Sequence, residues 1–275
     1  MKKETIIIST YNNKGGVAKT TYAGILALYL AREKKKVLVI DGDPQSNLTS
    51  RIYNYDHEDL TLGDLILNAD TTSMDKAIIK GFIPEYPTLD IIPANRDMRY
   101  MEEVLLNMDN TSERDLVIAK WLGDNIDIVD SYDYIIWDIS PSTSVLGRNI
   151  LNTCNKLLFV SEYNNIDSVE AIAKFIDEFS LYRFNNGFKM PEYAILINKY
   201  KKSLDAEKLY EPFEKCIDIV QENLISTKMI ESSVIRNCNL YKKDIITYTE
   251  ENKVNKKAMN LFLDIVDELK EKEII

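Results

Sequence analysis

The feature that most constrains this chain is a glycine-containing loop between a predicted strand and a predicted helix. The loop reads Asn-Asn-Lys-Gly-Gly-Val-Ala-Lys-Thr-Thr over residues 12–21. It follows an apolar run over residues 5–10 and leads into a helical pattern over residues 20–34. The first turn of a helix presents free N–H groups and the positive end of the helix dipole, which together favour a bound anion. The sequence therefore predicts a phosphate-binding loop at this point.

Two residues of the loop suit a bound nucleoside triphosphate. The Lys19 ammonium would reach the β- and γ-phosphates, and the Thr20 hydroxyl would ligate Mg²⁺. The ordinary pattern G-x-x-x-x-G-K-[ST] does not fit, because Asn13 and Ala18 stand at its two glycine positions. Ala18 is tolerable if its φ is negative, whereas a positive φ would strain it. The alternative is a glycine turn that binds nothing, and the two lysines and two threonines of the loop argue against it.

Composition sets the class of protein. The chain has 275 residues, 45% of them hydrophobic and 28% charged, which is ordinary for a globular protein. We expect neither a membrane span nor a signal peptide, and the three widely spaced cysteines fit neither a metal site nor a disulfide framework. The single histidine, His57, lies in an acidic stretch, which disfavours a Ser-His-Asp hydrolase. The net charge of −10 disfavours attraction of nucleic acid by the whole surface, but not by a local basic patch.

Strand-like and helical segments alternate along the chain, which is the pattern of a doubly wound sheet. Several strand segments are uninterrupted Ile, Val and Leu runs, as expected where helices cover both faces. We therefore predict an α/β fold with a mostly parallel, twisted sheet flanked by helices, in a single domain over residues 1–275. Strands are expected at 5–10, 37–41, 89–92, 134–138, 157–161 and 193–198, with a last one near 224–227. Helices are expected at 20–34, 60–68, 98–108, 112–130, 166–183, 204–221 and 254–272.

Acidic residues follow two of the predicted strands. One strand ends in Asp41, and Asp43 comes two positions later, so that both carboxylates point the same way. Another apolar strand ends in Asp138, the pattern of a Walker B aspartate that holds Mg²⁺ through water. The carboxyl ends of strands in an open α/β sheet face the ligand crevice. The sequence therefore predicts that these acids meet the phosphate-binding loop.

Residues 14–20 fit the pattern K-G-G-x-x-K-[ST], in which Lys14 precedes Lys19 by five positions. This loop resembles that of the deviant Walker-type ATPases, a family that includes the ParA partition proteins and MinD. The resemblance to ParA covers nearly the whole chain, because segments 61–65, 92–98 and 168–171 are also similar. It implies that ATP joins two copies of this chain in a sandwich dimer. Lys14 of each copy would then contact the phosphates held by the other.

Residues 41–47 resemble the ParA segment D-x-D-P-Q-G-N, with Ser46 in place of the glycine. By this match Asp43 orients the attacking water and Asp41 supports the Mg²⁺ shell, although local Asx-turn bonds are an alternative role for Asp41. The resemblance also places Asn198 against the adenine base. The implied catalytic residues are Lys14, Lys19 and Asp43, and the implied metal ligands are Thr20, Asp43 and Asp138. The implied nucleotide-binding residues are Asn13, Lys14, Gly15, Gly16, Val17, Ala18, Lys19, Thr20, Thr21 and Asn198.

Short ParA proteins bind DNA without sequence preference as ATP dimers, and this chain resembles that type, with no helix-turn-helix before Tyr11. The resemblance implies a Mg²⁺-dependent ATP hydrolase that is slow alone, because no arginine finger is visible, and a ParB-like centromere-binding partner that stimulates it. It also implies a cytoplasmic, nucleoid-associated protein that does not bind membranes. The loop that carries arginines in ParA has shifted or lost them here. The candidate DNA contacts are Lys199, Lys201, Lys202, Arg236, Lys242 and Lys243.

The alternative function is that of a MinD-like or cargo-positioning ATPase, which cycles on a membrane or a protein scaffold. A membrane-bound form would use the predicted helix at 254–272, whose apolar face holds Val254, Ala258, Leu261, Phe262, Ile265, Val266 and Leu269. Interfacial helices usually carry Lys and Arg on the polar face, whereas this polar face mixes acids with lysines. We therefore expect the helix to pack on the sheet. A nucleotide-binding module without turnover is a further alternative, and it would require Asp43 to be silent.

Overall fold

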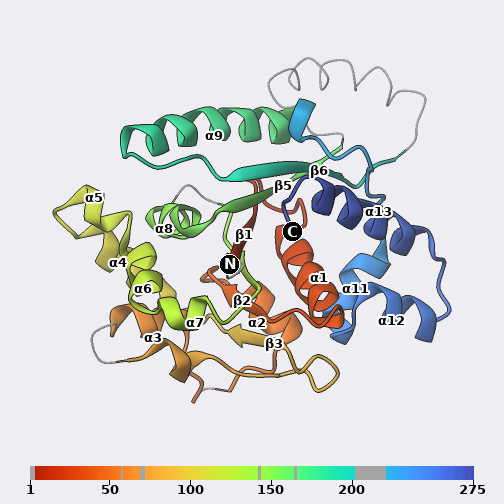
Figure 1. Cartoon of the computed structure of the whole chain (residues 1–275), viewed down its shortest axis with the longest axis horizontal. Coiled ribbons are helices and arrows are strands. Elements are labelled where there is room, and N and C mark those ends of the chain that lie inside the picture. Colours follow the sequence, from red (N-terminus) through yellow and green to blue (C-terminus); the bar gives the residue numbers. More distant parts are fainter. Residues whose placement is uncertain (1–3, 57, 69–71, 142–143, 164–165, 202–220) are drawn as a thin grey trace.

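The computed structural model describes residues 4–56, 58–68, 72–141, 144–163, 166–201 and 221–275. Its centre is a six-stranded sheet in the order β3-β2-β4-β1-β5-β6 (Figure 1). Every paired strand of this sheet runs parallel to its neighbour, so the predicted doubly wound fold is confirmed. The strands are β1 (Ile6–Tyr11), β2 (Val37–Asp41), β3 (Leu89–Ile92), β4 (Tyr134–Asp138), β5 (Lys156–Glu162) and β6 (Glu192–Asn198).

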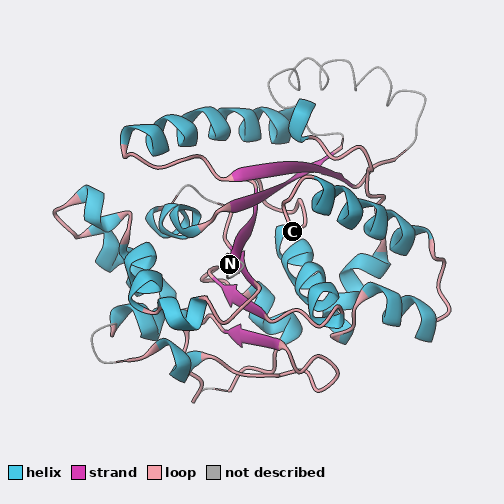
Figure 2. Ribbon diagram, in the orientation of Figure 1, coloured by secondary structure: helices cyan, strands magenta, loops and turns pink. Residues whose placement is uncertain are grey.

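Helices cover both faces of the sheet, and Figure 2 shows these layers. The helices that pack on one face are α1 (Lys19–Arg32), α2 (Asn47–Ile52), α11 (Ser233–Tyr241), α12 (Ile245–Glu251) and α13 (Lys257–Glu271). The helices that pack on the other face are α3 (Leu62–Leu67), α4 (Met98–Leu106), α6 (Val117–Asp124), α7 (Ile126–Val129), α8 (Val145–Thr153) and α9 (Ile166–Asn185). The shorter elements are α5 (Thr111–Arg114) and the 3₁₀ turns η1 (Met74–Ala77) and η2 (Gln221–Asn223).

The register of the strands brings the candidate site together at one edge of the sheet. All five residues of β2 and of β4 are buried, which explains their continuous apolar runs. Thr10 of β1 and Asp41 of β2 both pair with Asp138, so the three strands end at the same level. Gly42 then approaches β4 closely, because its N–H donates to the Asp138 carbonyl oxygen at 2.7 Å and a Cβ would meet the Ile150 side chain.

The C-terminal helix packs on the sheet, as predicted. Buried Phe262, Ile265, Val266 and Leu269 of α13 belong to the same apolar cluster as α1 and the strands. Removing these side chains from water stabilises the fold by about 1.5–3 kcal/mol each. The apolar face of α13 is therefore part of the core. In the part of the chain that the structure describes, no helix has both the length and the apolar character needed to cross a membrane.

The strand predicted near residues 224–227 is wrong. Leu224 makes only an isolated bridge to Ile195 of β6. The backbone N–H groups of Ser226 and Thr227 donate instead to the Glu268 carboxylate of α13, at 2.6 and 2.8 Å. A side chain thus accepts the hydrogen bonds of these two N–H groups, so they do not require a neighbouring strand.

The helix predicted over residues 112–130 is instead divided into α5, α6 and α7. The breaks fall at Asp115–Leu116 and at Asn125, whose side chain donates back to the Trp121 carbonyl oxygen at 2.8 Å. The predicted helix over residues 204–221 lies outside the described residues, apart from Gln221 in η2. The sequence also did not reveal the helices α2, α8, α11 and α12.

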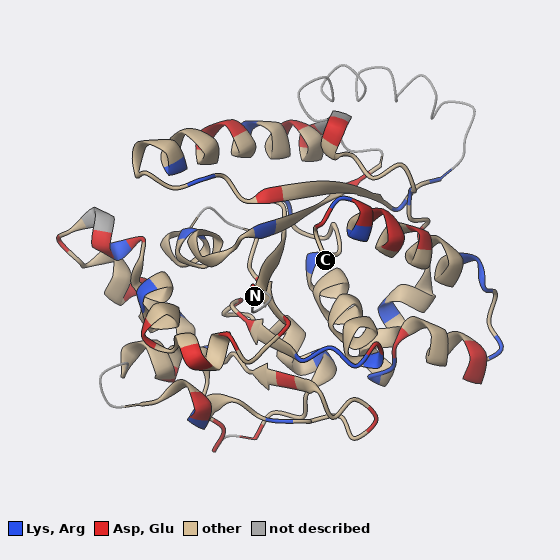
Figure 3. Cartoon of the chain, in the orientation of Figure 1, with Lys and Arg blue, Asp and Glu red and all other residues tan. Residues whose placement is uncertain are grey.

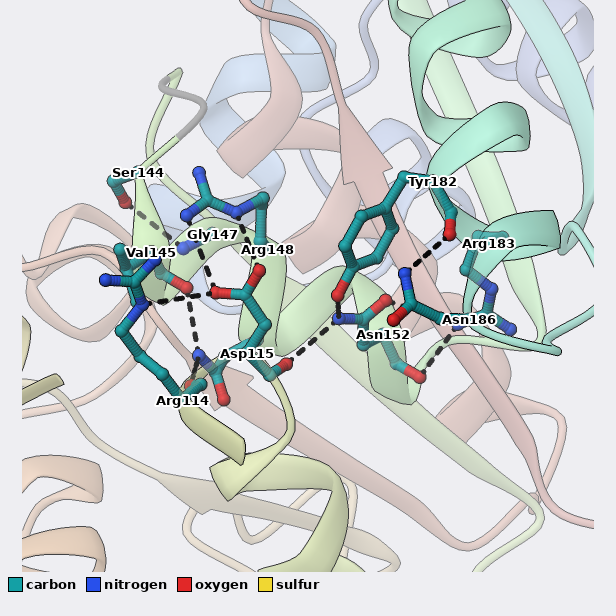
Figure 4. A network of polar contacts seen from close by, with 11 residues as sticks. Arg114, Asp115, Ser144, Val145, Gly147, Arg148, Asn152, Tyr182, Arg183 and Asn186 are labelled. Atoms are coloured by element: carbon teal, nitrogen blue, oxygen red, sulfur yellow. Dashed lines mark hydrogen bonds and ion pairs between the residues drawn. The ribbon is translucent and has the colours of Figure 1, made fainter. Parts of the chain in front are cut away.

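A buried polar network fixes α8 behind the site (Figure 4). Ser144 caps α8 by accepting the Gly147 N–H at 3.1 Å. The Asp115 carboxylate, just before α6, accepts from Arg148 at 3.2 Å. The Asn152 side chain donates to the Asp115 carbonyl oxygen at 2.9 Å. These bonds tie α8 to the segment before α6, and α8 in turn follows the loop after β4.

Candidate functional site

The predicted phosphate-binding loop joins β1 to α1, and hydrogen bonds of the Asn12 side chain hold its start in place. This side chain is fully buried and donates to the Val160 carbonyl oxygen of β5 and to Ser168 Oγ of α9, both at 2.8 Å. Its Oδ1 accepts the Lys14 N–H at 2.8 Å. Asn13 accepts a hydrogen bond from the Tyr11 hydroxyl. Sequence reasoning missed Asn12, although its place between the strand and the first lysine was visible.

Ala18 occupies the conformation that would strain it. Its φ is 87° and its ψ is 25°, in the left-handed region, and it forms the N-cap of α1. Gly16 also has a positive φ, of 81°, which a glycine adopts without cost. The sequence left the sign of the Ala18 φ open, and the structure gives the strained one.

We expect Ala18→Gly to stabilise the protein by about 1 kcal/mol. The left-handed conformation costs an alanine about 1–2 kcal/mol, and the greater freedom of glycine in the unfolded chain offsets part of the gain. Urea unfolding of both proteins would measure the difference. A destabilised Ala18→Gly protein would contradict the strained geometry.

Lys19 lies under the loop and is 6% exposed. Its Nζ donates to the Lys14 carbonyl oxygen at 2.8 Å, so the side chain curls back along the loop. Burial lowers the pKa of Lys19 to about 8, while the charges of Asp138 and Asp43 act in the opposite direction. The ammonium is therefore still charged at neutral pH, next to the place where the loop would hold phosphates.

Asp138 is a fully buried carboxylate whose two oxygens both lack a hydrogen-bond donor among the described residues. Burial and then the charge of Asp41 raise its pKa well above the usual range of an aspartate. The Thr20 hydroxyl lowers this pKa, but it does not reach the geometry of a full hydrogen bond. A buried carboxylate without donors is costly, which indicates that a cation belongs beside it.

The residues around Asp138 fit Mg²⁺. This ion prefers oxygen ligands and is usually held by one or two carboxylates together with substrate phosphates and water. Asp138, Asp43 and the Thr20 hydroxyl supply such oxygens. No group of three or more His, Cys, Asp or Glu residues that could hold a metal by itself occurs in the described part of the chain. Phosphate and water would therefore have to complete the shell.

The two acids after β2 have different surroundings. Asp41 is fully buried, and its oxygens accept from the Asp43 N–H at 3.0 Å and from the Thr49 N–H and hydroxyl at 2.8 Å each. Burial raises the Asp41 pKa to about 6 despite these bonds. Asp43 lines the cleft and accepts only the Gln45 N–H at 2.9 Å and a long contact of 3.5 Å from Asn47. The local-bond role thus fits Asp41, and Asp43 keeps an oxygen available to a ligand.

A cleft of about 670 Å³ opens over the loop. Its walls come from the loop, the first turn of α1, α2, the segment after β4, the end of β6 and the start of α11. Predicted residues that line it are Gly15, Gly16, Ala18, Lys19, Thr20, Thr21, Asp43, Asn198, Lys199 and Arg236. Residues that line it and were not predicted are Asn47, Arg51, Ile139, Pro141, Ile230, Glu231, Ser232, Ser233 and Ile235.

Asn198 stands at the end of β6, where it was expected to meet a base. Its Nδ2 donates to the Val17 carbonyl oxygen at 3.0 Å, and its Oδ1 accepts from the Tyr22 hydroxyl at 3.3 Å. The side chain therefore links β6 to the loop and to α1. Contact with a base remains a prediction, and Asn198 would make it from this fixed position.

The Lys14 side chain extends toward α9 and away from the cleft. Its Nζ lies 3.4 Å from the Asp167 carboxylate, and the two side chains are 39% and 85% exposed. An ion pair with this exposure is weak. Lys14 is thus at the surface beside the cleft, where a second molecule could reach it.

Two of the candidate DNA contacts pair with acids near the cleft. Lys199 Nζ lies 3.3 Å from Glu162 and also donates to the Gly16 carbonyl oxygen at 2.9 Å. Lys201 Nζ lies 2.8 Å from Glu231. These two lysines are therefore held by acids at the cleft wall and do not form a free basic surface.

The other candidates lie at the two ends of α11 or outside the described residues. Arg236 is exposed and lines the cleft, and Lys242 donates to a neutral asparagine side chain at 3.0 Å. Lys243 pairs with Glu251 of α12. Lys202 lies outside the described residues. Lys199, Lys201 and Arg236 lie around Glu231, whereas Lys242 and Lys243 lie at the other end of α11, and acidic and basic residues are interspersed in Figure 3.

Comparison with known proteins places this site in a family. The AAA_31 family, described as an AAA domain, matches residues 5–190. The chromosome partitioning protein ParA of Myxococcus xanthus is 33% identical over 176 residues, which cover 62% of this chain and 58% of that protein. The chain spans between 51% and 74% of the length of the first curated relatives that it matches.

Two solved structures share the fold. A plasmid partition protein from Borrelia burgdorferi bound to AMPPNP is 21% identical, with a TM-score of 0.71 over 98% of this chain and 100% of that chain. A variant of McdA from Cyanothece in complex with ATP is 18% identical, with a TM-score of 0.78 over 100% of this chain and 97% of that chain. Both similarities concern the fold, and both neighbours hold an adenine nucleotide or its analogue.

Proposed function

This chain belongs to the ParA/Soj-like family of P-loop ATPases, and we propose that it is a ParA-type DNA-segregation ATPase. In this proposal ATP and Mg²⁺ bind in the cleft above the loop, and the ATP form is a dimer that binds DNA. The observation that carries the nucleotide part is the buried Asp138 carboxylate, which finds no donor among the described residues and lies next to Lys19 and Thr20. Such a charge arrangement is typical of a site completed by a metal nucleotide.

The chemistry follows from the positions of the side chains. Lys19 would leave the Lys14 carbonyl oxygen and neutralise the β- and γ-phosphates, while the loop N–H groups bind their oxygens. Mg²⁺, when bound by Thr20 and Asp138, would offset the negative charge that develops on the phosphates. Asp43 would accept a hydrogen bond from the attacking water and orient it toward the γ-phosphate. Lys14 would complete the site in the partner copy.

We expect Lys14→Ala to bind ATP and to remain monomeric. The Lys14 side chain is 39% exposed at the surface, so its removal should leave the fold and the cleft intact. Across a dimer interface the same ammonium would meet phosphate charge, and its loss should weaken ATP-dependent dimerisation by about tenfold or more. Analytical ultracentrifugation with ATP, ADP or no nucleotide measures this change.

Lys120→Ala is a matched control, because Lys120 is an exposed lysine of α6 away from the cleft. It should dimerise with ATP as the wild type does. A stable ATP dimer of Lys14→Ala would refute the role of this lysine across the interface. A wild-type protein that stays monomeric with ATP would refute the sandwich dimer itself.

We propose that the ATP dimer binds DNA without sequence preference, through contacts to the phosphates of the DNA backbone. Of the candidate residues, Arg236 is exposed at the cleft and Lys242 donates to a neutral asparagine side chain, and a dimer would present each of them twice. Contacts of this kind release counterions, so binding should weaken steeply with salt. A ParB-like partner would stimulate hydrolysis and release, and the protein would be cytoplasmic and associated with the nucleoid.

The second candidate is a cargo-positioning or MinD-like ATPase, which would use the same ATP-dependent dimerisation but cycle on a membrane or a protein scaffold in place of DNA. The ion pairs of Lys199, Lys201 and Lys243 favour this alternative, because they reduce the basic surface that DNA would meet. A protein scaffold suits it better than a membrane, since the apolar face of α13 is buried in the core. Binding to DNA in the ATP form distinguishes the two candidates.

A further inference from the structure

Arg51 is a charged residue of the cleft that no sequence motif indicates. It lies near the end of α2, is exposed, and lines the cleft together with Lys19 and Thr20. Its Nη1 donates to Thr21 Oγ1 at 3.5 Å, which is the long limit of a hydrogen bond. Among the described residues Arg51 forms no ion pair with a carboxylate. The guanidinium therefore brings a positive charge to the cleft that only a weak neutral contact holds.

The backbone that carries Arg51 is fixed. Thr49, two residues earlier, binds the Asp41 carboxylate with both its N–H and its hydroxyl, at 2.8 Å each. Leu48 and Ile52 are fully buried in the core on either side of Arg51. This anchoring fixes the backbone from which the Arg51 side chain extends, so that only the side chain itself has to be ordered when a ligand binds.

The neighbours of Arg51 indicate which part of a nucleotide it would meet. The Thr21 carbonyl oxygen accepts from Asn239 of α11 at 3.1 Å, so Thr21 lies on the α11 side of α1. Lys19 and Asp43 mark the place of the γ-phosphate. Arg51, bonded to Thr21 and carried on α2, which packs against α11, therefore lies on the side of the cleft toward α11, next to the place of the phosphates.

We propose that Arg51 is a nucleotide-binding residue that contacts the α-phosphate of ATP and of ADP. A planar guanidinium binds phosphate oxygens through two parallel N–H groups, which a lysine cannot reproduce. The α-phosphate is the same before and after hydrolysis, so the contact raises affinity for both nucleotides without lowering the barrier. The inference rests on the proposed nucleotide site and does not depend on dimerisation or DNA binding.

The test compares Arg51→Ala with Arg51→Lys and the wild type. We expect Arg51→Ala to weaken the binding of Mg-ATP and of ADP by about tenfold or more, as measured by titration calorimetry. KM should rise by a similar factor while kcat stays within about twofold. Arg51→Lys should recover only part of the affinity. Arg99→Ala, which removes an exposed arginine of α4 away from the cleft, should behave as the wild type does.

The outcomes separate this inference from the proposed function. Unchanged affinity of Arg51→Ala for both nucleotides overturns the inference, while wild-type ATP binding leaves the function standing. A fall in kcat with unchanged ADP affinity also overturns it, because Arg51 would then act on the transferred phosphate. A wild-type protein that binds neither nucleotide overturns both. Because Arg51 is exposed, thermal unfolding of Arg51→Ala should match that of the wild type.

Discussion

Lys19→Ala is expected to abolish nucleotide binding. The Lys19 ammonium is buried, charged at neutral pH and held at the loop by the Lys14 carbonyl oxygen, so it is ready to bind the β- and γ-phosphates. Its loss removes charge-assisted hydrogen bonds worth about 1.5–3 kcal/mol each, and at least a hundredfold of affinity, roughly, should disappear. Titration with a fluorescent ATP analogue measures the effect.

Two controls make this result interpretable. Lys120→Ala removes an exposed lysine of α6 and should bind ATP normally. Thermal unfolding should show that Lys19→Ala still folds, although Asp138 and Asp43 then lose a compensating charge. ATP affinity retained in a folded Lys19→Ala protein would mean that the site is assigned wrongly.

Asp43→Ala should bind ATP and hardly hydrolyse it. Asp43 lines the cleft with one carboxylate oxygen held by the Gln45 N–H and the other only weakly engaged by Asn47. Orienting the attacking water is worth about 10²–10⁴-fold in rate, so kcat should fall within that range while ATP affinity is kept. Phosphate release under single-turnover conditions measures the chemical step directly.

The same variant should accumulate the ATP dimer and keep it on DNA. Asp124→Ala, which removes an exposed acid of α6, is the matched control and should turn over normally. Asp43→Asn should keep part of the turnover, since an amide oxygen still accepts a hydrogen bond from the water but carries no charge. Normal turnover in Asp43→Ala would show that another group orients the water. It would also reduce Asp43 to a local role as the acceptor of the Gln45 N–H.

The strands of this fold could be predicted because parallel strands covered on both faces have a simple signature. Val37–Asp41 and Tyr134–Asp138 are uninterrupted apolar runs ending in an acid, and their observed bounds match the predicted ones. The short helix α2 could not be predicted, because Asp41 and Thr49 hold it through tertiary bonds and not through helical periodicity. The segment at 224–227 has the composition of a strand, but the Glu268 carboxylate binds its N–H groups.

The parts of the candidate site that lie in short segments directly after strands could be predicted. Loop residues 13–21, Asp43 and Asp138 come from strand ends, which the parallel register brings to one edge. Apart from Arg236, the wall formed by residues 230–236 could not be foreseen, because only packing of α11 against α1 brings it to the cleft. Arg51 was missed for a similar reason, since only the orientation of α2 brings its side chain to the cleft.

In the function that we propose, ATP turns this chain into a DNA-binding dimer. The most direct test is binding of the wild-type protein to random-sequence duplex DNA with ATP, ADP or no nucleotide, at several salt concentrations. We expect binding only with ATP, with log Kd rising steeply with log salt. Binding that is equal in all three states, or no binding in any of them, would contradict it.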